Sequence, residues 1–194
     1  MQTPTDAPKA TDVSPGRIIL LHGPSSAGKS TIAASLQARL DEPFLHLSFD
    51  HFRASGVLPL AGMRAGKVDW LAMREPFFDG FHRAAAAFAS SGNNIIVEHI
   101  IETQEWMNTL LSVLSSIDVF FVEVYCPLPE LERREFLRGD RRVGDARRDF
   151  ATIQLDVEYD LRLFGTDPPE TNVEKLIHGW RNRARPSAFE RMAS

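Results

Sequence analysis

The stretch "LLHGPSSAGKST", residues 20–31, decides the fold class of this 194-residue chain. An apolar run ends there in a segment of Gly, Pro, Ser and Ala, which is followed by one lysine and two hydroxyl residues. Residues 23–30 fit the pattern G-x-x-x-x-G-K-[ST], which holds nucleotide phosphates where a strand precedes it and a helix follows it. Both conditions are met, because "RIILLHG" (17–23) is typical of a buried strand and "KSTIAASLQARL" (29–40) has helical spacing. The sequence therefore predicts a nucleoside triphosphate site at this loop.

Each residue type of the loop has a physical role in holding phosphate. Gly23 and Gly28 allow backbone angles that a Cβ would penalise, and the small residues between them let successive N–H groups converge on one anion. The helix N-terminus adds partial positive charge. We expect Lys29 to reach the β- and γ-phosphates and Ser30 to offer its hydroxyl to Mg²⁺. The predicted nucleotide-binding residues of the loop are Gly23, Pro24, Ser25, Ser26, Ala27, Gly28, Lys29, Ser30 and Thr31.

Four further apolar runs alternate with segments of helical spacing along the rest of the chain. The apolar runs cover residues 44–50, 93–100, 119–126 and 159–164. Helices are predicted at residues 74–92, 103–116, 129–139 and 169–184. Apolar runs with little alternation are typical of parallel strands covered on both faces. This order predicts an α/β domain with a parallel sheet and helices on both faces. In the helix at 74–92, we expect Phe77, Phe81 and Phe88 near one face.

Length and composition limit the class of protein. A chain of this length suits one domain, and we expect a disordered tail at residues 1–15 followed by a single domain at 16–194. The net charge of −4 disfavours a general nucleic-acid binder, which needs cationic surface. One cysteine, Cys126, excludes an intrachain disulfide.

No apolar run approaches the roughly 18 residues of a membrane span, and the first residues lack the apolar segment of a signal peptide. We therefore expect a cytoplasmic protein with neither a membrane nor a nucleic-acid partner. The oligomeric state stays open between a monomer and a homo-oligomer.

Two carboxylates end predicted strands on the side where parallel sheets bind ligands. Asp50 ends the second strand, where an acid can accept the proton of an attacking hydroxyl or help hold Mg²⁺; the alternative is a helix N-cap. Glu98 ends the third strand, and its burial needs a partner. It either holds Mg²⁺ or contacts substrate, or it pairs with a nearby basic residue. His51 is expected to be solvated or capping, and His99 to pack against the core.

Seven arginines lie within residues 132–148. Arginine suits the neutralisation of charge on a transferring phosphoryl group, and a lid that closes over a nucleotide can supply it. We assign the lid to about residues 138–148, with Arg138 and Arg141 as catalytic cations and Arg138 and Arg142 as nucleotide contacts. The remaining arginines are assigned to a solvated helix face: Arg133, Arg134, Arg147 and Arg148.

The acceptor is expected to bind at about residues 51–85. Within this segment, residues 54–70 mix large apolar side chains with charged ones, which suits either a pocket for an amphipathic molecule or an ordinary surface loop. The large apolar residues are Leu58, Leu60, Met63 and Trp70. On topology, "GTDPPE" (165–170) is expected near the adenine.

Taken together, several segments of the chain resemble the chloramphenicol phosphotransferase-like family of P-loop kinases. The segments are "GPSSAGKST" (23–31), "FDHF" (49–52), "GFHRAAAAFASSGNNIIVEHI" (80–100) and "CPLPELERREFLRGDRRVGDARRDF" (126–150). The resemblance runs in order over about residues 17–178.

The resemblance implies a three-layer P-loop NTPase fold with strand order 2-3-1-4-5 and a kinase-like lid. It implies Mg-ATP as the donor and transfer of the γ-phosphoryl group to a hydroxyl of a small molecule. The family's catalytic aspartate falls on Asp50, and its lid arginines match Arg138 and Arg141. Where the family often has an aspartate pair or Asp-His, this chain has Glu98-His99, so the resemblance leaves the role of Glu98 open.

The leading functional hypothesis is an ATP-dependent O-phosphotransferase, with an antibiotic such as chloramphenicol among the candidate acceptors. One alternative is a nucleoside or metabolite kinase of the same fold. Another is a nucleotide-gated regulatory ATPase.

Overall fold

The computed structural model describes residues 14–139, 143–153 and 157–194. Its centre is a five-stranded parallel sheet in the order β2-β3-β1-β4-β5, as the family resemblance implied. The strands are β1 Arg17–His22, β2 Leu45–Ser48, β3 Ile95–His99, β4 Asp118–Tyr125 and β5 Leu161–Phe164. Each lies within its predicted run, except that β4 begins one residue earlier.

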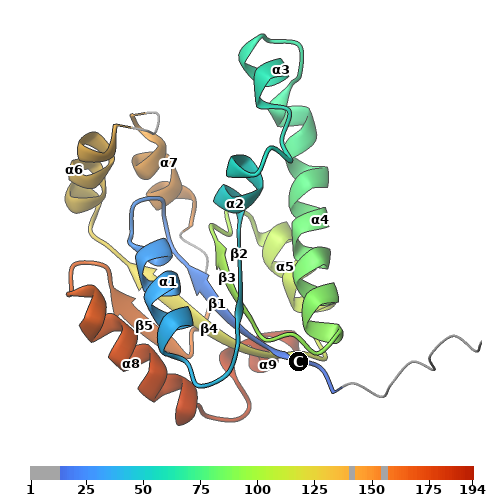
Figure 1. The fold of residues 1–194 in the computed structure, drawn as a ribbon, viewed down its shortest axis with the longest axis vertical. Helices are drawn as coiled ribbons and strands as arrows, with labels where there is room; N and C mark the ends of the chain where they lie inside the picture. Colours follow the sequence, from blue (N-terminus) through green and yellow to red (C-terminus); the bar gives the residue numbers. More distant parts are fainter. Residues whose placement is uncertain (1–13, 140–142, 154–156) are drawn as a thin grey trace, which may run out of the picture.

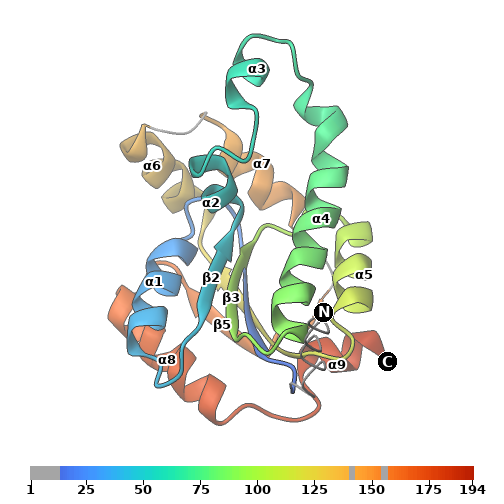
Figure 2. The same ribbon diagram turned by 45° about the vertical axis from the view of Figure 1, so that its right-hand side comes forward.

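Helices cover both faces of the sheet and complete a three-layer fold (Figures 1 and 2). The helices α1 (Lys29–Arg39) and α8 (Pro169–Arg181) contact each other on one face. The other face carries α4 (Trp70–Ser90), α5 (Gln104–Val113) and α9 (Ala188–Ala193). Four helices gather beyond the carboxyl ends of the strands: α2 (Phe49–Ala54), α3 (Leu60–Arg64), α6 (Leu128–Arg138) and α7 (Asp145–Thr152).

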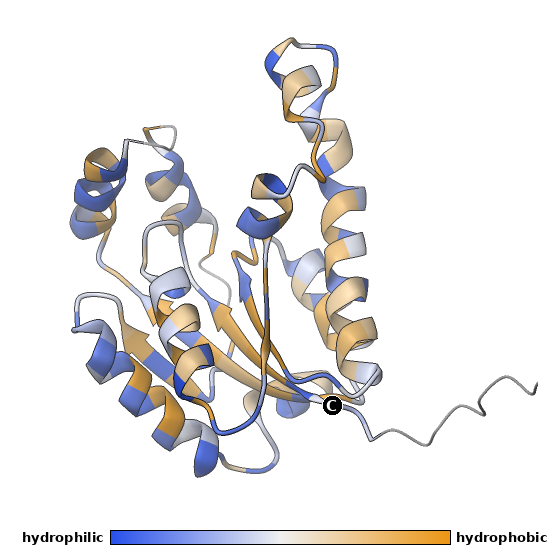
Figure 3. Ribbon diagram, in the orientation of Figure 1, coloured by the Kyte–Doolittle hydropathy of each residue, from blue (hydrophilic) through white to orange (hydrophobic). Residues whose placement is uncertain are grey.

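Alternate residues of β1 supply two separate hydrophobic cores. Ile19 and Leu21 are buried against the α1 and α8 side, whereas Ile18 and Leu20 are buried against the α4 and α5 side. Figure 3 shows apolar residues along the central strands, in agreement with this double burial. A strand covered on both faces has no polar face, which explains why the strand runs show so little alternation.

The second strand ends earlier than predicted, and this changes the position of Asp50. The Ser48 hydroxyl accepts a 3.2 Å hydrogen bond from the His51 amide and caps α2, which begins at Phe49. Asp50 therefore lies in the first turn of a helix rather than at the end of a strand. The capping role belongs to Ser48 and not to Asp50.

Helix α4 begins at Trp70, four residues before the predicted start. The Asp69 side chain caps it by accepting a 2.9 Å hydrogen bond from the Leu71 amide. Phe88 is exposed, so the expected apolar face was wrong at that position. The buried stripe of the helix consists of Phe78, Phe81, His82, Ala85 and Ala89.

Residues 54–71 contain the short helix α3, and α7 begins within the predicted lid and extends beyond it to Thr152. Neither helix was predicted, nor was α9. Residues 1–13 of the predicted tail and residues 140–142 of the predicted lid lie outside the described part of the chain. Among the described residues, every helix is too short or too polar to cross a membrane.

Candidate active site

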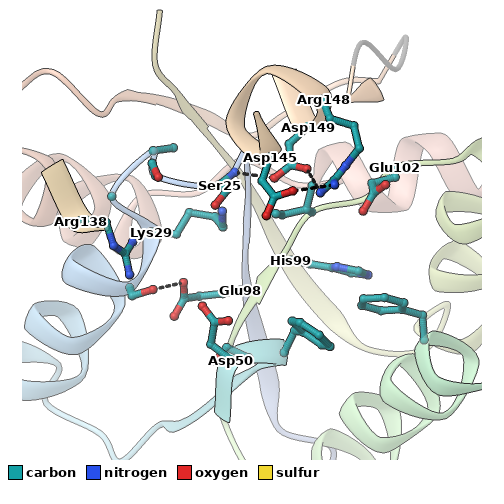
Figure 4. A pocket seen from close by; sticks show the side chains of 18 of the residues that line it. Ser25, Lys29, Asp50, Glu98, His99, Glu102, Arg138, Asp145, Arg148 and Asp149 are labelled. Carbon is teal, nitrogen blue, oxygen red and sulfur yellow. Dashed lines mark hydrogen bonds and ion pairs between the residues drawn. The ribbon is translucent and has the colours of Figure 1, made fainter. Parts of the chain in front are cut away.

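A pocket of about 680 Å³ opens at the carboxyl edge of the sheet. The loop after β1 forms one wall, α2 and the first turns of α4 form another, and α6 and α7 contribute charged side chains (Figure 4). The sheet register aligns Glu98 of β3 with Ser48 of β2 and with Leu21 of β1. Glu98 and Ser48 both line the pocket at this edge. The ligand site thus lies where parallel α/β sheets place it.

The loop at residues 23–30 has the backbone shape of an anion cradle. A Cβ on Gly23 would meet the Val124 carbonyl oxygen at 2.4 Å, so only glycine allows this close approach. Ser26 and Gly28 have φ of 66° and 101°, and left-handed residues of this kind turn successive N–H groups toward one point. Lys29 is 8% exposed, and its ammonium donates to the carbonyl oxygens of Gly23 and Pro24, each at 2.8 Å.

A second close approach joins the loop after β5 to the same cradle. A Cβ on Gly165 would lie 2.2 Å from the Ala27 carbonyl oxygen, and the Gly165 carbonyl accepts a 2.7 Å hydrogen bond from Arg134. This contact places the start of the segment 165–170, where we expect the adenine, directly against the phosphate loop.

We predict that Gly165→Ala lowers the free energy of unfolding by about 1–3 kcal/mol, because the new methyl must displace the Ala27 backbone. The same shift should weaken ATP binding. Thermal melts and ATP titrations measure both effects. Gly80→Ala is the control, since its Cβ would meet nothing within 4 Å in a helix, so it should leave ATP binding unchanged and stabilise the fold slightly. Equal behaviour of the two variants would contradict the close-contact explanation.

Glu98 is held between a hydroxyl and an imidazole at the bottom of the pocket. The Ser30 hydroxyl donates to its Oε2 at 2.7 Å, and His46 Nε2 lies 2.6 Å from its Oε1. Burial alone would raise the pKa of this carboxyl, but the His46 hydrogen bond, the charge of Lys29 and the Ser30 hydrogen bond outweigh it and lower the pKa. Glu98 is therefore ionised although it is only 6% exposed. The alternative that Glu98 pairs with a nearby basic residue also holds, because His46 contacts its carboxylate.

The pair of Ser30 and Glu98 suits Mg²⁺, which prefers oxygen ligands and is held through one or two protein groups together with phosphate oxygens. In the described part of the chain, no three His, Cys, Asp or Glu side chains assemble as a metal site. A dedicated cage is not needed for an ion of this kind. The residues thus fit a magnesium ion that arrives with a nucleotide.

The structure brings most of the predicted site residues together. Lys29, Asp50, Glu98 and Arg138 all line the pocket, and Figure 4 shows Asp50 and Glu98 directed into the same part of it from α2 and β3. Arg138 extends from the last turn of α6 toward the phosphate loop (Figure 4). The predicted lid residues Arg141 and Arg142 lie outside the described residues.

The wall opposite the phosphate loop is largely aromatic. Trp70, Leu71 and Phe78 line it, and the Phe78 ring stacks on His99 with centroids 5.4 Å apart. An ion pair of Arg74 and Glu102, at 2.6 Å, lies in the same wall. The expected pocket at 54–70 is therefore wrong in its extent, because among the described residues only Trp70 of that segment lines the pocket and the first turns of α4 supply the rest.

Three histidines in this region are buried: His22, His82 and His99. His99 packs against the core as expected, with its Nε2 2.7 Å from that of His82, and it also lines the pocket. Burial holds the pKa of His99 well below its usual value and lowers the pKa of His82 to about 4. His22, whose Nδ1 accepts from the Ile101 amide, has a pKa lowered to about 3, first by burial and then by Lys29.

These histidines predict a loss of stability in acid. Because the pKa of each histidine is lower in the folded protein than the unfolded value of about 6.5, unfolding takes up protons. Their contribution to the free energy of unfolding is therefore fully present above pH 6.5 and is lost as the pH decreases toward 4. Each such histidine contributes up to about 1.4 kcal/mol per pH unit. The free energy of unfolding, measured with urea between pH 7 and 4, should depend less steeply on pH in His22→Asn than in the wild type. The amide oxygen of the new side chain can replace Nδ1. The control is His178→Asn, which replaces an exposed histidine and should leave the pH dependence of the wild type unchanged. An unchanged pH dependence in His22→Asn would refute the assignment of the acid sensitivity to His22.

Sequence reasoning missed the site contacts of two arginines. Arg134 was assigned to solvent, yet it donates to the carbonyl oxygens of Ser26 and Gly165 at 3.4 and 2.7 Å. Arg148 is exposed, as assigned, but it also lines the pocket, which was not predicted. The spacing of Arg134 and Arg138, one turn apart on α6, was a usable signal for the first. Arg133 and Arg147 do lie on the exposed face, paired with Glu130 and Glu132.

Comparison with known proteins decides the family. The sequence model of the family described as chloramphenicol phosphotransferase-like protein matches residues 16–180. This chain belongs to that family. Two Mycobacterium tuberculosis proteins, from strains CDC 1551 and ATCC 25618 / H37Rv, are each 31% identical to this chloramphenicol phosphotransferase-like chain over 197 residues. The alignment covers 91% of this chain and 88% of theirs, and both carry the provisional name O-phosphotransferase.

Solved kinase structures share the fold of this chloramphenicol phosphotransferase-like protein. The APS kinase CysC of M. tuberculosis, solved with AMPPNP and APS, has a TM-score of 0.65 at 22% identity and covers 86% of this chain and 98% of its own. A gluconokinase from Sinorhizobium meliloti has a TM-score of 0.62 at 15% identity, with coverage of 88% and 94%. At these identities the likeness establishes the P-loop kinase fold, while the family and its named relatives make the chain a small-molecule kinase with O-phosphotransferase chemistry.

Proposed function

We propose that this protein transfers the γ-phosphoryl group of ATP, with Mg²⁺, to a hydroxyl of a small molecule that carries an apolar ring. One observation carries the proposal: a single pocket joins the phosphate loop to an aromatic wall, with Asp50 and Glu98 between them. A nucleotide-binding switch needs the loop but not the wall. The likeness to an APS kinase solved with AMPPNP supports an adenine nucleotide as the donor.

The residues divide the reaction between them. Asp50 accepts the proton of the acceptor hydroxyl, whose oxygen forms a bond to the γ-phosphorus as the bond from that phosphorus to the ADP oxygen breaks. The products are ADP, the phosphorylated acceptor and one proton, which leaves from Asp50. Lys29, the loop amides and Arg138 neutralise the charge that shifts toward the leaving oxygen. Ser30 and Glu98 would hold Mg²⁺, which supplies further positive charge at the phosphates when it is bound.

The acceptor end of the pocket favours an amphipathic molecule. Trp70, Leu71 and Phe78 offer apolar surface to a ring, and the Arg74–Glu102 pair offers one donor and one acceptor group to polar substituents. An antibiotic such as chloramphenicol is one such molecule. A nucleoside or metabolite kinase is the nearest alternative, because only the acceptor differs.

An ATP-dependent phosphorylation screen of antibiotics and metabolites, analysed by mass spectrometry, tests the proposal. We expect at least one hydroxylated compound with a ring to gain one phosphoryl group, and we expect the hydroxyl-free analogue of that compound to gain none. Phosphorylation confined to nucleosides or to ring-free metabolites would select the alternative kinase.

A further inference from the structure

Helix α7 contacts the phosphate loop through a buried carboxylate. Asp149 is 2% exposed, and its Oδ2 accepts a 3.2 Å hydrogen bond from the Ser25 amide in the loop. Its other oxygen, Oδ1, accepts a 2.9 Å hydrogen bond from the Arg148 guanidinium. One carboxylate therefore links the loop to a cation that lines the pocket.

Arg148 is directed into the pocket, whereas its neighbour on the helix is not. A second carboxylate, Asp145, holds the Arg148 guanidinium at 2.8 Å, and Figure 4 shows the three side chains grouped on the side of the pocket that carries Glu102, away from Arg138. The Arg148 side chain remains 59% exposed. Arg147 instead pairs with Glu132 on α6 at 2.6 Å.

The start of α7 is fixed in place by α6. Glu135, which is buried, accepts hydrogen bonds from the Gly144 and Ala146 amides at 2.8 and 2.7 Å. Ala146 is itself part of the core around α1 and α8. The first turn of α7 is therefore positioned before any ligand arrives, and such preorganisation is what a charge-stabilising arginine requires.

We infer that Arg148 contacts the γ-phosphate of bound ATP and that Asp149 is a positioning residue that ties this guanidinium to the phosphate loop. The inference rests on the proposed function, because it takes ATP as the ligand. Arg148 lies at the boundary between the loop and the acceptor wall, where the transferring group must sit. A guanidinium has five N–H donors, so the two carboxylates leave donors for phosphate oxygens.

Calorimetric titration with ATP and with ADP tests this contact without an acceptor. We expect Arg148→Ala to weaken ATP binding by about tenfold or more and to leave ADP binding within about twofold, because only ATP has the γ-phosphate. Arg147→Ala, on the adjacent exposed position, should bind both nucleotides as the wild type does. Asp149→Asn retains an oxygen for the Ser25 amide but loses its charge, so it should show a smaller loss confined to ATP.

Arg148→Gln, which keeps most of the side-chain stem, is measured alongside, and thermal melts confirm that each variant is folded. Unchanged ATP binding in both Arg148 variants would overturn the inference and leave the proposed function intact. Equal losses for ATP and ADP would also overturn it, because they would indicate a structural role in the loop. If the wild type binds neither nucleotide, the proposed function itself fails together with this inference.

Discussion

Lys29→Ala is expected to reduce phosphoryl transfer by about a thousandfold and to weaken ATP binding. Lys29 is buried, and its ammonium lies 2.8 Å from two carbonyl oxygens of the loop, so its charge is confined to the phosphate cradle. A charge in such a site is worth far more than one in water. Steady-state transfer rates and calorimetric titration with ATP measure the two effects.

Lys67→Ala provides the matched control, because Lys67 is exposed and lies outside the pocket residues. It should transfer phosphate at the wild-type rate. A folded Lys29→Ala protein that keeps more than about a tenth of the wild-type transfer rate would contradict the role of the loop lysine in phosphoryl transfer.

Asp50→Asn is expected to lower transfer by about a hundred- to ten-thousandfold while ATP binding stays close to that of the wild type. The amide keeps the shape of the carboxylate but cannot accept the proton of the acceptor hydroxyl. Asp50 lies in the first turn of α2, across from the loop that binds the nucleotide, so its loss should affect chemistry rather than donor affinity.

Asp41→Asn is the companion variant, since Asp41 is exposed and paired with Arg181 away from the pocket. It should retain full activity. If Asp50→Asn lost ATP binding along with transfer, Asp50 would have to be reassigned from proton acceptor to metal ligand or structural residue.

The fold could be predicted from the sequence because its signals are local. The loop pattern, the uniform strand runs and the intervening helices each depend on neighbouring residues, and the strand order followed from the family resemblance. The end of β2 was harder to predict, because the apolar pattern continues into Phe49 although the Ser48 hydroxyl caps α2 there. A local side-chain cap, not the apolar pattern, decided that boundary.

The site residues could be predicted where a local signal marks them, as in the phosphate loop or near the end of a strand. Glu98 was visible as a carboxylate at the end of a buried strand, but its partner His46 depends on the register of β2 against β3. Arg148 was missed because α7 is short and is positioned by Glu135 of another helix. Contacts of this kind have no sequence spacing that reveals them.

ADP release measured against acceptor concentration tests the central claim most directly. With an acceptor identified in the screen, the proposed transfer predicts ADP release that rises with acceptor and saturates, with one molecule of phosphorylated acceptor formed for each ADP. Release at one constant rate across a broad panel of hydroxylated compounds, with inorganic phosphate as the only other product, would contradict the claim and favour a regulatory ATPase.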